Sequence, residues 1–358
     1  PEERSDVMYH RYNGGGVTID GPSILVRKNF ADQYSVSGNY YVDDISSASI
    51  DVVTTGASED GYHEKRTEYS ITGDYLNEKS LLSAGYTYSD ESDYTANTYY
   101  IGISQDFFGD LSNISFGYSR GDDDVSRNND PAFSENATRN SYSISMSQII
   151  TPKLILGIGY NFITDEGFLQ NPYRQYRYID PNNTSNQLEA YEVYPQTHSS
   201  DAVSFNMMYY LDYRASLSAE IRYFSDDWGI NAGNAEVSYT HTWRNNWIFD
   251  ISYRYYSQDK ADFYSDLFQT ASQDPKDYRS RDKEMSNFTN HTIGIGISYL
   301  LPYKNRFMEK STISLQWDRI FFSYDDFRDL RDTGATVGEE KLYDFDADVF
   351  KLFMTLWY

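Results

Sequence analysis

The chain has 358 residues, a formal net charge of −24 at pH 7 and no cysteine, and aromatic residues make up 17% of it. The acidity argues against nucleic acid as a partner, because phosphates and acidic side chains repel one another. No run approaches the roughly 18–20 apolar residues of a membrane helix, so a helical membrane protein is excluded. The 36 tyrosines among many Ser, Asn, Asp and Gly residues are instead typical of a barrel wall with aromatic girdles, one lipid-facing side and one wet side.

The first 22 residues form a segment of their own. Residues 5–12 can make a strand, with residues 13–16 (NGGG) as its turn, or the segment can lie inside a barrel, where glycines allow close backbone contact. From residue 23 onward we count about 15 crossings, yet a barrel with both ends in the periplasm needs an even number. We therefore predict a barrel over residues 23–358, completed by residues 1–22 to about 16 strands, with 14 as the alternative and a lumenal plug as the other role of this segment.

Strict alternation of apolar with small or polar residues recurs along the chain. It is clearest, in chain order, at 142–146, 217–223, 247–255 and 293–299. Alternation puts one set of side chains on each face of a strand. The segments are about 10–14 residues long and end in aromatic residues, as a tilted membrane crossing with interfacial girdles requires. The prediction is an all-β, antiparallel, up-and-down transmembrane barrel.

The connections between these segments alternate between short and long. The short ones carry turn residues and lie at 31–32, 77–79, 108–110, 151–153, 213–215, 245–246 and 304–306. The long ones cover roughly 44–64, 121–137, 166–199, 259–288 and 324–346, with shorter members near 90–95 and 226–232. In outer-membrane barrels short turns face the periplasm and long loops face outward. We expect an integral protein of a Gram-negative outer membrane, and, since no export signal precedes Pro1, a chain whose signal peptide has been removed.

Many acidic residues fall in the long connections. In the segment 120–132 (RGDDDVSRNNDPA), Asp122, Asp123 and Asp124 offer the hard oxygen ligands that Ca²⁺ prefers, although the full spacing of an EF-hand is missing. Two interpretations stay open. The acidic loops can bind divalent cations, including those that bridge to lipopolysaccharide phosphates, or they are simply solvated.

The loop 166–199 interleaves arginine with tyrosine, at Tyr173, Arg174, Tyr176, Arg177 and Tyr178. These side chains can fold inward as a constriction whose guanidinium groups oppose lumenal acids. They can equally stack on neighbouring loops.

Charged residues also occupy the polar face of the predicted strands. They are Glu68, Asp74, Glu220, Arg222, Asp250, Arg254 and Asp318. Opposed charges set a transverse field across an open pore, and they also brace a plugged barrel by pairing. Their presence therefore does not distinguish the two.

Catalytic and metal-binding motifs are absent. The five histidines show no H-x-x-x-H or H-E-x-x-H spacing, and without cysteine we expect no transition-metal centre. His241 and His291 lie in predicted strands with aromatic or apolar neighbours on the same face, so a lipid-acting enzyme is the weakest hypothesis. We expect no enzymatic activity and no cofactor other than Ca²⁺ at the outer loops.

The chain ends in one apolar stripe, formed by Phe350, Leu352, Met354, Leu356 and the terminal Tyr358. This stripe resembles the C-terminal signal by which the insertion machinery recognises outer-membrane barrels.

Three segments carry a resemblance to a known family: MYHRYNGGGVTIDGPSILVRK at 8–28, NPYRQYRYID at 171–180 and YPQTHS at 194–199. The chain resembles a bacterial outer-membrane family catalogued as a domain of unknown function. The resemblance implies the barrel and the outer membrane, and it supplies no activity for any residue. The family is associated with a small lipoprotein, a thioredoxin-like protein and a flavin transferase, which hints at a redox assembly.

Three functions follow as hypotheses. The first is a porin-like channel for small hydrophilic solutes or cations. The second is a plugged structural or docking barrel in a surface complex, with a lipoprotein or other subunits as partners. The third is the lipid-acting enzyme. In every case outer-membrane lipid, lipopolysaccharide and the insertion machinery are expected partners.

Overall fold

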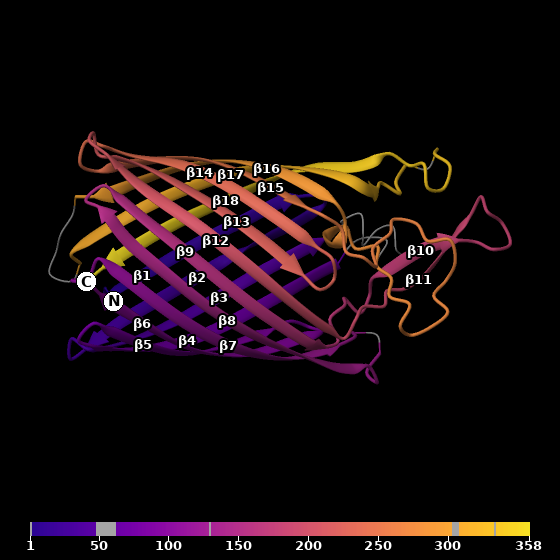
Figure 1. The fold of residues 1–358 in the computed structure, drawn as a ribbon, viewed down its shortest axis with the longest axis horizontal. Helices are drawn as coiled ribbons and strands as arrows, with labels where there is room; N and C mark the ends of the chain where they lie inside the picture. The colour runs from indigo at the N-terminus through magenta and orange to yellow at the C-terminus, as the bar shows by residue number, and fades with distance from the viewer. Residues whose placement is uncertain (1, 48–61, 129, 303–307, 333) are drawn as a thin grey trace.

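The computed structural model describes residues 2–47, 62–128, 130–302, 308–332 and 334–358. Within these residues sixteen antiparallel strands form one closed barrel, in which β1 pairs with β18 (Figure 1). The sixteen-strand, up-and-down prediction is confirmed. The strands are β1 Arg4–Gly14, β2 Val17–Phe30, β3 Tyr34–Ser47, β4 Tyr62–Asn77, β5 Ser80–Asp90, β6 Tyr94–Phe107, β7 Ser112–Ser126, β8 Ser134–Thr151, β9 Leu154–Gly167, β12 Thr197–Leu211, β13 Ala215–Asp226, β14 Asn231–Trp243, β15 Trp247–Gln258, β16 Phe288–Leu301, β17 Lys310–Arg328 and β18 Leu342–Trp357.

Three smaller elements lie in the long loops. The strands β10 (Gln175–Ile179) and β11 (Gln187–Tyr191) form a separate hairpin that projects beyond the barrel end (Figure 1). The 3₁₀ turn η1 covers Lys283–Met285. Among the described residues no helix is long and apolar enough to cross a membrane.

The N-terminal segment supplies a strand of the wall. The strand β1 pairs along its whole length with β2 and β18. Gly15 and Gly16, both with positive φ, make the turn to β2. Gly14 packs so tightly on β18 that a Cβ there would lie 2.3 Å from the Cβ of Ala347. The even strand number brings both chain ends to the same end of the barrel (Figure 1).

Most strand positions present large apolar side chains outward and small or polar ones inward, with inward aromatic exceptions near the cap such as Phe224 and Tyr256. On β8, Tyr142, Ile144 and Met146 are 47%, 40% and 41% exposed, and serines alternate with them. A continuous apolar outer surface of this kind is costly in water, whereas it matches a bilayer. Tyrosine pairs across neighbouring strands, such as Tyr34 with Tyr75 at 4.9 Å between ring centroids, stabilise the wall.

The connections follow the predicted alternation, with two exceptions in length. The short turns hold non-glycine residues in the left-handed region, at Ala31, Asp32, Glu78, Phe108, Asp110, Arg214 and Arg244. The connections predicted at 121–137 and 324–346 are shorter, because β7 and β8, and likewise β17 and β18, stay paired further outward. The turn predicted at 304–306 and most of the loop 44–64 lie outside the described residues.

Candidate functional site

The lumenal wall is the first part of the candidate site. All seven charged residues predicted there lie on the face opposite the lipid-facing side chains. Glu220 and Arg222, for example, flank Ile221, which points outward and is 61% exposed. Asp74 accepts hydrogen bonds from the Ser35 and Ser83 hydroxyls, both at 2.7 Å.

Much of this inner wall is open to water. Ser143, Ser145, Ser147 and Asn206 point inward and are exposed. Glu220 and Arg222 are exposed as well, and within the described residues neither has a hydrogen bond or an ion pair. This part of the inner wall therefore presents small polar and charged side chains to solvent.

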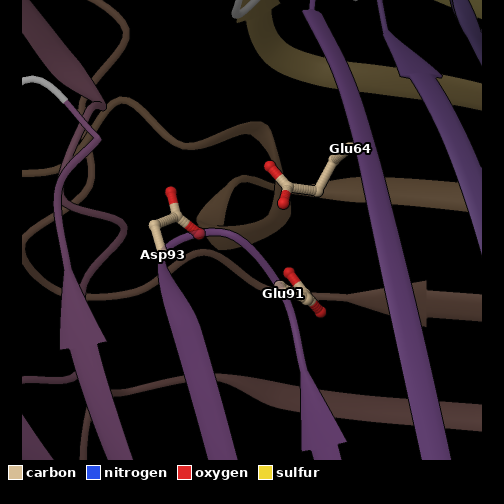
Figure 2. A group of neighbouring side chains, drawn as sticks. All are labelled: Glu64, Glu91 and Asp93. Atoms are coloured by element: carbon tan, nitrogen blue, oxygen red, sulfur yellow. The ribbon is translucent and has the colours of Figure 1, made fainter.

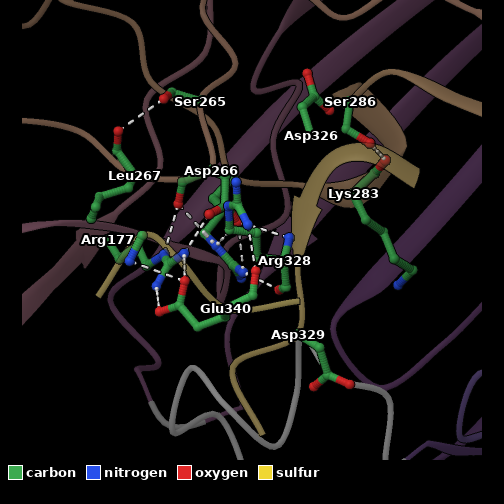
Figure 3. Close-up of polar contacts among 12 residues, drawn as sticks. Arg177, Ser265, Asp266, Leu267, Lys283, Ser286, Asp326, Arg328, Asp329 and Glu340 are labelled. Atoms are coloured by element: carbon green, nitrogen blue, oxygen red, sulfur yellow. Dashed lines mark hydrogen bonds and ion pairs between the residues drawn. The ribbon is translucent and has the colours of Figure 1, made fainter. Parts of the chain in front are cut away.

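A cap of three loops lies at the outer mouth, built from residues 168–196, 259–287 and 329–341. Arg177, from the first loop, is 1% exposed. Its Nη1 and Nη2 donate to the two carboxylate oxygens of Glu340 in the third loop, at 2.6 and 3.0 Å, and its Nε donates to the Asp266 carbonyl in the second loop at 2.8 Å (Figure 3). Arg177 also forms an ion pair with the Asp266 carboxylate. One buried guanidinium therefore ties all three loops together.

A second arginine extends this network. Arg281 forms an ion pair with Asp266 at 3.0 Å, and its guanidinium carbon lies 4.4 Å from the centroid of the Phe327 ring. Its backbone N–H donates to Oε1 of Glu192 at 2.6 Å. Glu192 is 1% exposed, and its Oε2 has no hydrogen-bond partner among the described residues. Burial raises the pKa of Glu192, and the nearby Arg174 guanidinium offsets only part of that increase.

The arginine–tyrosine series of the first loop does not form a constriction. Tyr173 accepts a hydrogen bond from the Asn128 backbone at 2.9 Å, and Arg174 forms an ion pair with Asp282. Tyr176 is 1% exposed and packs edge-on against Phe268. Of the two arrangements left open by the sequence, the structure has the one in which these side chains pack on neighbouring loops.

The second loop of the cap is anchored on the inner wall. Its residues Ala261 and Tyr264 are buried against the inward side of the last strands. The buried cluster consists of Ile230, Ala232, Ala261, Tyr264, Tyr324, Phe327 and Tyr343. The cap therefore covers the mouth on the side of β13–β18.

An acidic group lies elsewhere on the same rim. Glu64, at the start of β4, meets Glu91 and Asp93 of the β5–β6 turn, with candidate ligand oxygens all within 4.8 Å of one another (Figure 2). Burial raises the pKa of Glu91, and the Glu64 and Asp93 carboxylates raise it further, although Arg66 opposes this. Three half-buried carboxylates of this kind attract cations. No local pattern in the sequence indicates this group, because the β4–β5 hairpin separates Glu64 from Glu91 and Asp93.

The acidic residues predicted as a calcium loop are not brought together. Asp122, Asp123 and Asp124 lie within β7 rather than in a loop, so successive side chains point to opposite faces. Asp123 points inward and accepts from the Tyr94 hydroxyl, whereas Asp122 points outward and pairs with Arg120 at 2.9 Å. The prediction of a divalent-cation loop at this place is wrong, because polar strand residues were taken for a loop.

The two strand histidines have aromatic partners. His241 is hydrogen-bonded to the Tyr239 hydroxyl at 2.9 Å, and His291 to the Tyr253 hydroxyl at 2.7 Å. Within the described residues, neither ring is hydrogen-bonded to a serine or a carboxylate.

The C-terminal stripe divides into two parts. Phe350, Leu352 and Met354 point outward and are exposed, as predicted. Leu356 is half-buried, and Tyr358 follows the end of β18. The Tyr358 hydroxyl donates to the Arg27 carbonyl at 3.0 Å, so the last residue closes the seam between the two ends of the chain.

Comparison with known proteins identifies the fold. The chain is similar to a solved structure described as a bacterial polysaccharide outer membrane secretin, at 9% identity and a TM-score of 0.54, covering 99% of this chain and 98% of that one. It is also similar to two Pseudomonas aeruginosa proteins, OccD3 (OpdP), at 9% identity, TM-score 0.47 and 99% and 90% coverage, and opdK, at 9% identity, TM-score 0.46 and 100% and 99% coverage.

The fold is therefore that of outer-membrane β-barrels. A search of curated proteins finds no match to the sequence. Residues 51–313 match the model of a family described as "Protein of unknown function (DUF3570)", and the chain belongs to that family.

Proposed function

We propose that this protein is a porin-like channel of a Gram-negative outer membrane that passes small hydrophilic solutes and prefers cations at its mouth. The observation that carries the proposal is the exposed, polar inner wall of β8, β12 and β13, where Glu220 and Arg222 have no ion-pair partner among the described residues. A wall of small hydroxyl side chains lets a sixteen-strand lumen hold water. The acidic group of Glu64, Glu91 and Asp93 supports the preference for cations.

The proposed channel is passive, without catalysis or a cofactor. The tyrosine partners of His241 and His291 support this, because a lipid hydrolase needs a histidine beside a nucleophile and a carboxylate. Divalent cations at the acidic rim and lipopolysaccharide around it remain proposed partners.

The test is electrical recording from the full chain, purified in detergent and inserted into planar bilayers in KCl. We expect stepwise, ohmic conductance and, in a KCl gradient, a reversal potential of the sign given by excess K⁺ permeability. Insertion without conductance steps would overturn the channel. Anion-selective steps would overturn the cation preference alone.

A docking barrel is the second candidate, and one observation favours it. The β10–β11 hairpin projects beyond the barrel, and its Leu188 is 41% exposed and Tyr191 53% exposed (Figure 1). Recovery of the protein from its native membrane as a stoichiometric complex that dissociates when Leu188 and Tyr191 are replaced by serine would support this function.

A further inference from the structure

A cavity of about 320 Å³ lies between the inner wall of β13–β15 and the second loop of the cap. Its size is near the lower end of the roughly 300–1,000 Å³ found for small-molecule sites. It is therefore suited to one small molecule rather than to a polymer.

One side of the cavity is apolar. Phe224 and Tyr256 come from the wall, Ile230 from the β13–β14 turn and Met285 from η1. The Tyr256 ring packs at a tilt against Phe288, with 5.5 Å between ring centroids, and this contact holds the ring in place. This side would exclude a fully hydrated ion and would favour a flat apolar group.

Most polar groups around the cavity are already occupied. His198 is hydrogen-bonded through Nδ1 to Asp165 and through Nε2 to Asp226, both at 3.0 Å. Because carboxylates only accept, both ring nitrogens donate, so His198 is an imidazolium that has no donor left for a ligand. Gln258 donates to the backbone carbonyl of Ser286 at 3.0 Å and accepts from the Tyr256 hydroxyl at 2.7 Å.

Arg222 is different. It lines the cavity and is exposed, and within the described part of the chain no hydrogen bond or ion pair involves it. Its cross-strand neighbours are Ser204 on β12 and Asn234 on β14, both neutral, and Asn234 also lines the cavity. The nearest acid on its own strand, Glu220, lies two residues further from the mouth. A free guanidinium offers paired donors that match one carboxylate.

We propose that this cavity binds a small organic anion with a flat apolar body, such as an aromatic carboxylate. Arg222 holds the carboxylate in a bidentate hydrogen bond, and the body lies against Tyr256 and Phe224. The site faces the lumen, so it would retain this class of solute during passage. The inference rests on the proposed channel only for that passage, because binding can be measured without conduction.

The test is calorimetric titration of benzoate into the full chain in detergent at pH 7.5. We expect saturable binding at one site, with acetate, which lacks the ring, and benzylamine, which has the opposite charge, at least tenfold weaker. Arg222→Gln should weaken benzoate binding at least tenfold, the effect expected when a paired Arg–carboxylate contact is removed. The matched control is Arg120→Gln, which removes an exposed, outward-pointing arginine of β7 that does not line the cavity and should leave binding unchanged.

A second variant tests the apolar half without altering charge. Ala232 lines the cavity, so Ala232→Leu should fill it and weaken benzoate binding while Arg222 stays in place. Circular dichroism confirms that each variant is folded.

Equal benzoate affinity in the wild type and Arg222→Gln, absence of saturable binding, or acetate binding as tight as benzoate would overturn the proposal. Conductance in KCl without benzoate binding would overturn the proposed anion site and leave the proposed channel standing. Benzoate binding without conductance would overturn the channel and leave the anion site standing.

Discussion

Arg177 shows how one side chain can organise a region that no local pattern defines. It is buried, and its five N–H groups reach Gln187 in its own loop, Asp266 in the second loop and Glu340 in the third. Desolvating two carboxylates and a guanidinium is costly, so the arrangement is stable only while all three are present. The residue is therefore a tie between loops rather than a pore-lining charge.

Replacing Arg177 by methionine should loosen the contacts among the three cap loops while the barrel stays folded. The loss leaves Glu340 buried without its cation and Asp266 paired with Arg281 alone. Removing one partner of a buried ion pair costs about 3–5 kcal/mol. We expect faster hydrogen exchange and proteolysis within 168–196, with unchanged exchange in the strands. Arg331→Met is the control, since its side chain is 55% exposed and it pairs with Asp329 within its own loop; equal loosening in both variants would contradict the role given to Arg177.

Glu192 and Glu340 give the cap opposite pH dependences. Burial raises the pKa of Glu340, but the hydrogen bonds from Arg177 and the Gly338 amide outweigh it and bring the pKa below the ordinary value of 4.5. The stability that ionised Glu340 gives to the cap is therefore present above pH 4.5, and it is lost as the pH falls through the lowered pKa. The pKa of Glu192 is raised, so its contribution is present below pH 4.5 and is lost as the pH rises through its pKa.

Glu192→Gln should therefore stabilise the cap at neutral pH. The amide oxygen can still accept from the Arg281 backbone N–H and the Ser280 hydroxyl, while no charge needs to be buried. Hydrogen exchange of 168–196 should be slower than in the wild type at pH 7 and should approach it near pH 4. A faster exchange at pH 7 would show that the ionised carboxylate is needed.

The strands and turns could be predicted from the sequence because they depend on residues that are close together in the chain. Strand alternation and turn chemistry are local, and the sixteen strands and short turns were predictable for that reason. The contacts of Arg177 with Asp266 and Glu340 span 89 and 163 residues, and no spacing rule connects such positions. The Asp122–Asp124 run failed for another reason, since acidic residues suit a paired strand above the bilayer as well as a loop.

Tyr358, at the seam between β1 and β18, has two proposed roles. Its hydroxyl forms hydrogen bonds in the folded barrel, and its aromatic ring serves as part of the insertion signal. Its hydroxyl donates to the backbone carbonyl of Arg27, and Lys28 lies 5.3 Å from its ring centroid. Tyr358→Phe keeps the ring and removes only the hydrogen bonds of the hydroxyl, with the Arg27 and Arg4 carbonyls and the Ser5 hydroxyl. We therefore expect normal insertion and a small loss of stability, about 0.5–1.5 kcal/mol. Tyr358→Ala also removes the aromatic end, and membrane insertion in cells should fall. Equal insertion of both variants would show that the ring is not read during assembly.

The whole molecule carries its charge unevenly. The mouth has the group of Glu64, Glu91 and Asp93 on one side and the cap on the other, where Asp266 and Glu340 are paired with arginine. Within the described residues no ion pair involves the three carboxylates of this group, so solutes that pass it meet an acidic surface. The field of that surface extends about 10 Å at 0.1 M salt and about 3 Å at 1 M.

Neutralising the acidic group should therefore lower cation selectivity in a salt-dependent way. In the triple variant Glu64→Gln, Glu91→Gln, Asp93→Asn, we expect the reversal potential in a dilute KCl gradient to move toward zero. Near 1 M KCl the reversal potential of this variant should differ little from that of the wild type. The matched control changes Asp32, Asp110 and Asp212 to Asn, which removes three charges from turns at the opposite end of the barrel without disturbing the left-handed backbone of the first two. Because the two ends of the barrel are further apart than the distance over which these fields extend, charges at the far end act little on the mouth. The control should therefore shift selectivity less. An equal shift in both variants would mean that selectivity follows net charge and is not set at the mouth.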